Sequence, residues 1–226
     1  MSLKIIHTAD WHLGQTFFGY DRDEEHEAFL SWLIDILTLR QTDVLLIAGD
    51  VFDVANPSAA AQRRFFRFLR EANRHNPQLQ IVIIAGNHDS AARLEAPIPL
   101  LEELNTSIVG IVPRTDLCKI DFDSLLIPLY NKEGKREAIC LAVPYLRQGD
   151  YPASKEGKDT YVEGVTRMYR QLYDYADSQR QPGEALFAMG HLHATGAELS
   201  EDDRSERTIM GAVSYTHLTL PTTSRV

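Results

Sequence analysis

The sequence is short of cysteines, of long hydrophobic runs and of positive charge. Its 226 residues include two cysteines, Cys118 and Cys140, which form no C-x-x-C pair. This pattern predicts free thiols in a reducing compartment rather than a disulfide framework. No apolar run reaches the roughly 18 residues that cross a bilayer. The opening residues MSLKIIHTADWHLG lack the basic and apolar regions of a signal peptide. We therefore expect a cytoplasmic protein with no membrane partner.

The charge balance excludes one way of binding nucleic acid. Lysine and arginine number 23 against 32 aspartates and glutamates, a net charge of −9. This argues against a module that holds DNA or RNA by neutralising phosphates alone. It leaves open a nucleic-acid enzyme whose positive charge comes from bound metal ions. Hydrophobic residues at 44% and charged residues at 24% are ordinary globular values and exclude a disordered or fibrous chain.

Hydrophobic periodicity predicts an α/β fold. Over the first 90 residues, apolar runs typical of buried strands alternate with segments of helical spacing, and Ser58 is an expected helix N-cap. Such alternation favours a parallel sheet whose ligands lie beyond the carboxyl ends of the strands. Short β-like runs over 106–146 predict a second, largely antiparallel sheet. We expect strands at 3–7, 43–48, 80–85 and 185–189, and helices at 24–40, 58–73 and 159–179.

Metal-binding side chains follow four of these strands. Asp10 and His12 are one residue apart, so an extended loop would direct both to one side. Asp50 follows Gly49, and His191 follows Gly190; a glycine there permits a sharp exit and a close backbone approach. The pair Asn87 and His88 follows Gly86 in the same way. Carboxylate, imidazole and amide donors without thiolate suit Mn, Fe or Zn. One carboxylate, Asp50, could bridge two ions roughly 3.5–4 Å apart.

Several of these residue types have ordinary structural explanations. Taken alone, Asp10 fits a turn and Asp50 fits a cap; the ordered set D-x-H, G-D-x-x-D and G-N-H-D is what favours a metal site. His7 is expected to pack in its strand, and His26 and His75 to lie on helix surfaces. A stripe of arginines at helical spacing is either a solvated face or a contact for DNA or a partner chain. The stripe consists of Arg63, Arg67, Arg70 and Arg74.

The ordered motifs resemble the calcineurin-like metallophosphoesterase family. The resemblance implies a sandwich of two mixed β-sheets flanked by helices, with a two-metal site at the strand ends. It extends over residues 3–213. Four segments are similar to a narrower group within the family, namely DNA exonuclease subunits that act with an ATPase. They are HTADWHLGQTF, DVLLIAGDVFDVANPS, IVIIAGNHDS and MGHLHATGAELSEDDRSER.

The resemblance implies a role for each side chain at the strand ends. His88 would contact the scissile phosphate and protonate the leaving oxygen. Asp53 and Asp89 would either orient neighbouring groups or only cap their loops. Two divalent ions, with Mn²⁺ favoured, would be held on a shared bridging carboxylate and four further ligands. These metal ligands are Asp10, His12, Asp50, Asn87 and His191.

The sequence departs from the family pattern near its last motif. The family closes its site with a G-H-x-H pair, which GHLH at 190–193 resembles. No other histidine lies between His88 and His191 to fill the preceding single-histidine motif. We therefore assign His191 to that motif and leave His193 as an alternative ligand. On this assignment, residues 1–213 form an incomplete metallophosphoesterase domain, and residues 214–226 are a non-native tail.

The predicted function is a metal-dependent DNA nuclease subunit for repair and recombination. The resemblance implies double-strand exonuclease and single-strand endonuclease activity. The partners implied are DNA and an SbcC-type ATPase subunit, with a homodimer inside a heterotetramer. Another metallophosphoesterase, acting on nucleotides or phosphoproteins, is the first alternative. An inactive fragment that lacks the last metal motif is the second.

Overall fold

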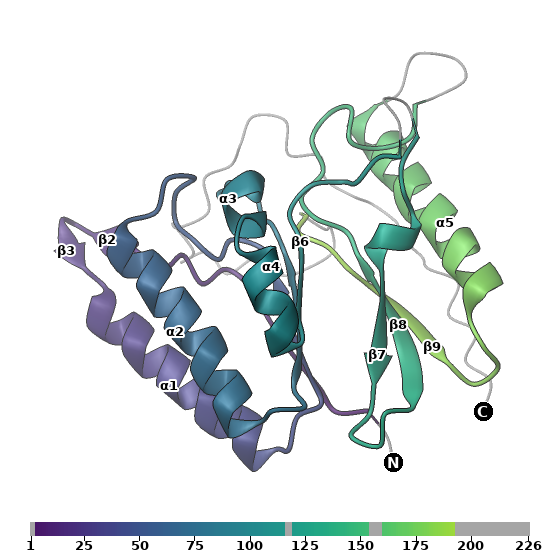
Figure 1. The fold of residues 1–226 in the computed structure, drawn as a ribbon. Coiled ribbons are helices and arrows are strands. Elements are labelled where there is room, and N and C mark those ends of the chain that lie inside the picture. The colour runs from purple at the N-terminus through teal and green to yellow at the C-terminus, as the bar shows by residue number, and fades with distance from the viewer. Residues whose placement is uncertain (1–2, 116–118, 154–159, 193–226) are drawn as a thin grey trace, which may run out of the picture.

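The computed structural model describes residues 3–115, 119–153 and 160–192, which form two β-sheets packed face to face with helices outside them (Figure 1). In the described chain, the first sheet is parallel with the order β1-β4-β5-β6, and the second has the order β7-β8-β9. In the second sheet, β7 and β8 are antiparallel and β8 and β9 are parallel. The fold is thus the predicted α/β sandwich. The strands of the two sheets are β1 (Ile5–Thr8), β4 (Val44–Ala48), β5 (Gln80–Ile84), β6 (Thr106–Val109), β7 (Leu126–Tyr130), β8 (Arg136–Ala142) and β9 (Ala185–Met189).

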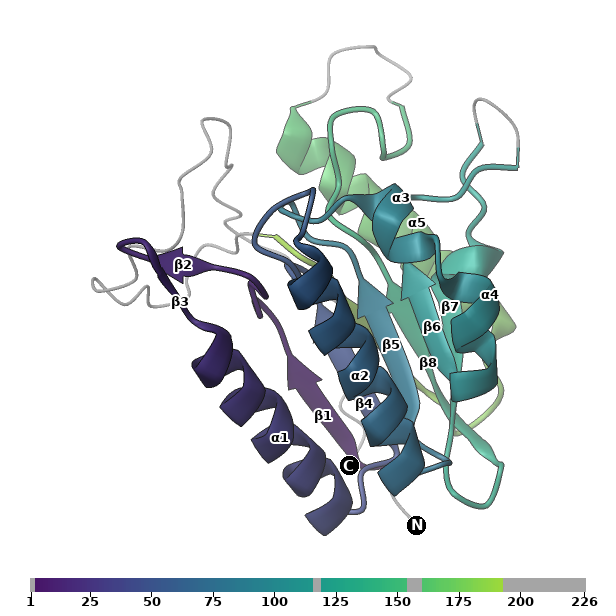
Figure 2. The same cartoon turned by 60° about the vertical axis from the view of Figure 1, so that its left-hand side comes forward.

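The helices cover the outer faces of the two sheets. Figure 2 shows α1 and α2 side by side along the first sheet, and Figure 1 shows α5 beside the second. Ser58 caps α2 by accepting a hydrogen bond from the amide of Ala61, as predicted. Among the described helices, none is both long and apolar enough to cross a membrane. The helices are α1 (Asp23–Leu39), α2 (Ala59–His75), α3 (Ala91–Glu95), α4 (Ile98–Leu101) and α5 (Tyr161–Gln179), and a hairpin of β2 (Thr16–Phe17) and β3 (Tyr20–Asp21) precedes α1.

The central strand β4 joins the two halves of the core. All five of its residues are buried. Leu46 and Ala48 pack in the cluster between the sheets, whereas Leu45 and Ile47 pack in the cluster under α1 and α2. The continuous apolar run is therefore covered on both faces, as parallel strands in α/β folds are. The thiol of Cys140 is buried and free, as predicted, and burial raises its pKa to about 12.

Three strand predictions need correction. The first strand is not buried, because β1 lies at an edge of its sheet and Ile5 is 38% exposed. The last strand, β9, is also an edge strand and is only partly covered. The run at 106–109 was expected in the second sheet, but β6 pairs in parallel with β5 and completes the first. An apolar run predicts a strand, but its neighbours in space decide whether both faces are covered.

Candidate metal centre

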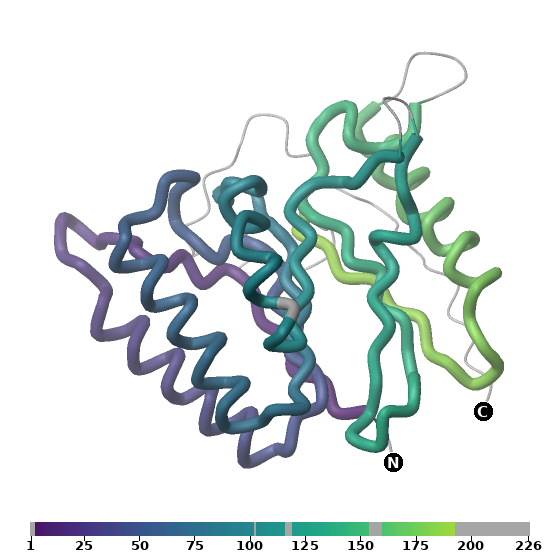
Figure 3. Tube along the Cα trace, viewed as in Figure 1, coloured from purple at the N-terminus to yellow at the C-terminus, as the bar shows by residue number. Residues whose placement is uncertain are grey.

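The loops after β1 and β4 run side by side at the carboxyl edge of the first sheet. The trace in Figure 3 follows the strand–helix repeats that bring these ends together. The amide of Asp10 donates to the carbonyl of Gly49 at 3.1 Å, and the amide of His12 donates to that of Asp50 at 3.0 Å. A third bond joins Leu13 to Val51. Two of the predicted ligand segments are thus held in register beyond the sheet.

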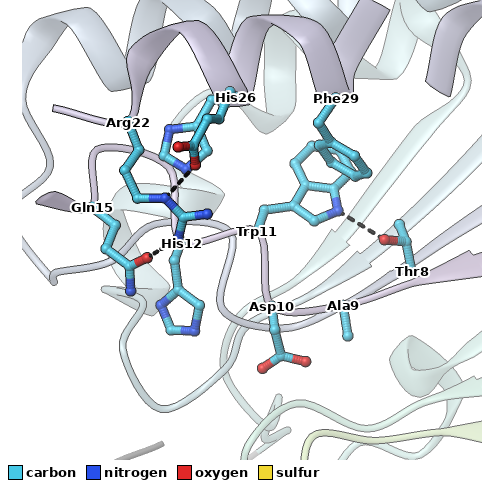
Figure 4. Close-up of a pocket in the computed structure, with 10 residues that line it drawn as sticks. Thr8, Ala9, Asp10, Trp11, His12, Gln15, Arg22, His26 and Phe29 are labelled. Atoms are coloured by element: carbon cyan, nitrogen blue, oxygen red, sulfur yellow. Dashed lines mark hydrogen bonds and ion pairs between the residues drawn. The ribbon is translucent and has the colours of Figure 1, made fainter. Parts of the chain in front are cut away.

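The first loop directs its two ligands by a different route from the one predicted. It is not extended, because Asp10 and His12 have φ values of 57° and 45°. Trp11 between them is 5% exposed; its ring packs edge-on against Phe68, and its Nε1 donates to Thr8. Figure 4 shows Asp10 and His12 pointing away from the Trp11 ring. The buried indole therefore anchors the loop and leaves both ligands on the open side.

Two glycines are required by close approach. A Cβ at Gly49, whose φ is +88°, would overlap the His191 ring and lie 2.9 Å from the Cα of Gly86. A Cβ at Gly86 would overlap the carboxylate of Asp50. Asp50 itself has a φ of 49°, a left-handed conformation that residues other than glycine adopt at a cost. The prediction that glycine precedes these ligands for reasons of space is confirmed at both positions.

The donor atoms fall into two groups that share one carboxylate. Side-chain oxygen and nitrogen atoms of Asp10, His12 and Asp50 lie within 4.8 Å of one another. On the other side, Asp50 Oδ2 is 3.4 Å from His191 Nε2, which is 2.9 Å from Asn87 Oδ1. The Asp50 side chain is 4% exposed. Carboxylate, imidazole and amide donors converging on one buried carboxylate fit a pair of divalent cations.

A third cluster overlaps the first group. His12, Asp53 and His88 also offer atoms within 4.8 Å of one another. His12 Nδ1 is 3.3 Å from Asp53 Oδ1, yet it is buried without a hydrogen bond in the described structure. An imidazole nitrogen in this state is suited to bind a metal ion through its lone pair, or to donate an N–H hydrogen bond to a repositioned carboxylate. Asp53, predicted either to orient its neighbours or to cap its loop, therefore stands close enough to act as a ligand.

The ring of His191 is oriented by the backbone. Its Nδ1 lies 2.9 Å from the carbonyl of Ala48, to which it donates, so Nε2 faces Asp50 and Asn87. Such outer hydrogen bonds fix the metal-facing nitrogen of a histidine. Burial opposes the charged form of the ring, but the hydrogen bond and charge of Asp50 outweigh it and raise the pKa of His191 to about 9. Burial likewise opposes ionisation of Asp50, yet His191 and His88 hold its pKa below the usual value.

His88 stands at the rim of the donor groups. Its amide donates to Asp50 Oδ1 at 2.9 Å, and its ring Nδ1 lies 2.8 Å from the carbonyl of Asp53. Donation from Nδ1 leaves Nε2 facing the site, 4.0 Å from Asp50 Oδ2. The side chain is 28% exposed, so a substrate can reach it. This is the placement that a proton donor to a leaving group requires.

Asp89 ties two loops together. Its carboxylate accepts hydrogen bonds from the amides of Val51 at 3.2 Å, Phe52 at 3.0 Å and Gly86 at 2.9 Å. The residue is 2% exposed. Burial raises the pKa of Asp89, and the three amide donors act against that rise. Asp89 thus positions the loops that carry Asp50 and Asn87.

A pocket of about 410 Å³ opens beside the first donor group (Figure 4). Sequence reasoning missed Gln15, Arg22 and His26 in its wall. His26 was expected on the helix surface, but it is 6% exposed, and its Nδ1 has no hydrogen-bond partner among the described residues. Its spacing from Leu30 and Leu33 could have placed it on the buried face of α1. The pocket is lined by Thr8, Ala9, Asp10, Trp11, His12, Gln15, Arg22, Glu25, His26 and Phe29.

The buried His26 should make stability pH-dependent. Burial, and then the nearby Arg22 cation, lower the pKa of His26 below its ordinary value near 6.5. As pH falls from 6.5 towards this lowered pKa, the unfolded chain binds more protons than the folded one. In that window the free energy of unfolding should therefore decrease as the pH decreases. The decrease should be smaller in His26→Phe. Urea unfolding from pH 7.5 to 5.0 measures the slope, with exposed His75→Phe as control; equal slopes in wild type and His26→Phe would contradict the assignment.

Other predicted residues lie outside the site or outside the described chain. Of the arginine stripe, Arg67 pairs with Glu27, and Arg70 and Arg74 pair with Glu71. These pairs favour the solvated-face interpretation. His193, the alternative ligand, and the tail at 214–226 lie outside the described residues.

Comparison with known proteins agrees with this geometry. The family model described as calcineurin-like phosphoesterase matches residues 3–213. Proteins named as the SbcD component of the SbcCD nuclease are similar to the chain: that of Rhodobacter capsulatus is 44% identical over 92% of this chain and 52% of its own length. The protein of Escherichia coli K12 is 33% identical over 88% and 48%, and that of Bacillus subtilis 31% over 89% and 50%.

The chain thus spans about half the length of the curated relatives it matches. The segment that the family model covers includes every predicted ligand, together with Asp53 and Asp89. Membership of this family explains why metal-binding side chains gather at the strand ends. The family implies divalent metal ions, and candidate metal-binding residues are present there. The chain belongs to the calcineurin-like phosphoesterase family.

Proposed function

We propose that this chain is the catalytic part of a metal-dependent DNA nuclease that hydrolyses phosphodiesters. One observation carries the proposal: the buried carboxylate of Asp50 is shared by two groups of metal-binding atoms at the strand ends. Relatives named as a nuclease component support DNA as the substrate and an SbcC-type ATPase as the partner. We further propose Mn²⁺ as the metal, a homodimer within a heterotetramer, and residues 1–213 as the phosphoesterase domain.

The site residues have separate roles in this proposal. One ion would be held by Asp10 and His12 and the other by Asn87 and His191, with Asp50 between them. When bound, the ions would stabilise negative charge on the phosphate and on the leaving oxygen. The protein contributes the orientation of the catalytic and metal-binding rings. Backbone carbonyls accept hydrogen bonds from the rings of His191 and His88 and so fix their direction.

His88 is proposed to protonate the leaving oxygen. Its Nδ1 is engaged by the carbonyl of Asp53, so a proton on Nε2 faces the site. Asp53 thus holds the ring from its main chain, while its side chain lies beside His12. A positioned proton donor of this kind contributes roughly 10²–10⁴-fold to a rate.

The proposal is tested by the variant His88→Ala with Mn²⁺ and duplex DNA. The amide of residue 88 still donates to Asp50, so the metal content should stay at the wild-type value. The rate of DNA hydrolysis should fall by about 10²–10⁴-fold. An unchanged rate would remove His88 from the mechanism. A phosphomonoester assayed beside DNA tests the substrate class, and faster turnover of the monoester would contradict a nuclease.

A further inference from the structure

The hairpin of β2 and β3, which follows the loop that carries Asp10 and His12, displays aromatic side chains to solvent. Phe17, Phe18 and Tyr20 are 65%, 88% and 78% exposed, and the rings of Phe17 and Phe18 lie 4.6 Å apart in an edge-on arrangement. We call these three residues the aromatic tip. In Figure 2 the hairpin projects beyond the first turn of α1, at the end of the molecule where the carboxyl ends of the first sheet lie. So much exposed aromatic surface on one short element is uncommon unless it contacts something.

The turn between β2 and β3 holds Phe18 in a strained backbone conformation. Phe18 and Gly19 are the two central residues, with φ values of 49° and 83°. Two-residue hairpin turns of this hand favour Asn-Gly, because asparagine tolerates the left-handed conformation better than phenylalanine does. Packing does not offset the strain, since Phe18 is almost fully exposed. Folding therefore does not explain the phenylalanine at position 18, and a strained residue that packing does not require is typical of a functional position.

The hairpin is tied directly to His12, a predicted ligand, and to Asp53. The amide of Gln15 donates to the carbonyl of His12 at 3.0 Å, and its side-chain amide donates to Asp53 Oδ1 at 3.4 Å. Arg22, at the other end of the hairpin, donates to Gln15 Oε1. The six residue-to-residue steps from His12 to Phe18 span at most about 20 Å, the length of about six stacked nucleotides at 3.4 Å each. A strand with its phosphodiester at the metals comes within reach of the tip.

The chemistry of the hairpin fits nucleobases better than phosphates. The flanking charges are mainly acidic: Asp21 adjoins the tip, and Asp23, Glu24 and Glu25 form the first turn of α1. The guanidinium of Arg22 is already paired with Glu25. Aromatic rings stack on the flat face of any base without requiring positive charge, but only where the base is unpaired.

Resting on the proposed nuclease function, we propose that Phe17, Phe18 and Tyr20 stack on unpaired bases of the DNA strand whose phosphodiester lies at the metal centre. The tip thereby selects single-stranded or frayed segments. A fully paired duplex with closed ends offers it no base face.

The variant Phe18→Asn tests this inference, because asparagine suits the turn and removes the ring. Its thermal midpoint should equal or exceed that of wild type. Its affinity for a single-stranded oligonucleotide containing 2-aminopurine, measured by fluorescence with Ca²⁺, should fall by about 5–150-fold. Phe18→Trp should keep the affinity and the stacking-induced quenching. Tyr130→Asn, which removes an exposed aromatic from the second sheet, should bind like wild type.

A second substrate separates this inference from the proposed function. Bis(p-nitrophenyl) phosphate has no nucleobase, so Phe18→Asn should hydrolyse it with Mn²⁺ at the wild-type rate. If wild type itself does not hydrolyse this diester or DNA, the proposed function fails, whatever the hairpin does. If wild type is active and Phe18→Asn binds single strands equally well, stacking is overturned. Loss of binding to the ATPase partner with unchanged DNA affinity would also overturn it and assign the tip to a protein contact.

Discussion

Asp50→Asn is expected to reduce phosphodiester hydrolysis by at least about a hundredfold while leaving the fold intact. Changes to groups that only support metal ligands already cost roughly 10–100-fold, and Asp50 is the carboxylate proposed to serve both ions. Asparagine keeps the size of the side chain and an oxygen for the amide of His88. It removes the negative charge that the two donor groups share. The loss should therefore appear in metal binding and rate.

Three measurements check this expectation. Elemental analysis should find fewer bound ions per chain than in wild type, and the rate on DNA with Mn²⁺ should fall. In the metal-free protein, the His191 ring should titrate well below the value of about 9 that its Asp50 partner imposes. The matched control is Asp35→Asn, an exposed position on α1, which should behave like wild type. Wild-type metal content and rate in Asp50→Asn would show that the carboxylate bridges nothing.

Asp89→Ala is expected to destabilise the protein strongly. The substitution leaves three buried amides, those of Val51, Phe52 and Gly86, without their acceptor. Each buried unsatisfied donor costs about 1–3 kcal/mol, so the free energy of unfolding should fall by about 3 kcal/mol or more. For a chain of this size, that corresponds to a fall in Tm of about 6–12 °C.

Urea unfolding with a surface control measures the effect of Asp89. Asp121 also accepts two hydrogen bonds, from the amide and hydroxyl of Ser124, but on the exposed surface. Asp121→Ala should therefore cost less than about 1 kcal/mol. Asp89→Asn retains one carbonyl oxygen and should fall between the two. Equal losses at positions 89 and 121 would mean that the loop amides find other partners and that Asp89 is only a cap.

The layout of the protein follows from local patterns in its chain. Strand-like and helical periods alternate, and parallel strands place their carboxyl ends at one edge, so the loops carrying Asp10, Asp50 and Asn87 had to be neighbours. The α2 boundary followed from Ser58, whose side chain can cap only locally. Glycines at 49 and 86 indicated close approach, and Cβ atoms there would overlap the site. These features could be predicted because they depend on residues near one another in the chain.

Burial and contacts, in contrast, became known only from the folded chain. The exposed edge of β1, the placement of β6 in the first sheet and the burial of His26 each depend on segments distant in sequence. The same is true of Asp89, because its three donors come from two loops that meet only in the folded chain. Periodicity reports the local backbone, whereas exposure and hydrogen bonding are properties of neighbours in space. The aromatic tip illustrates the difference, because the residue type alone does not tell an exposed phenylalanine from a buried one.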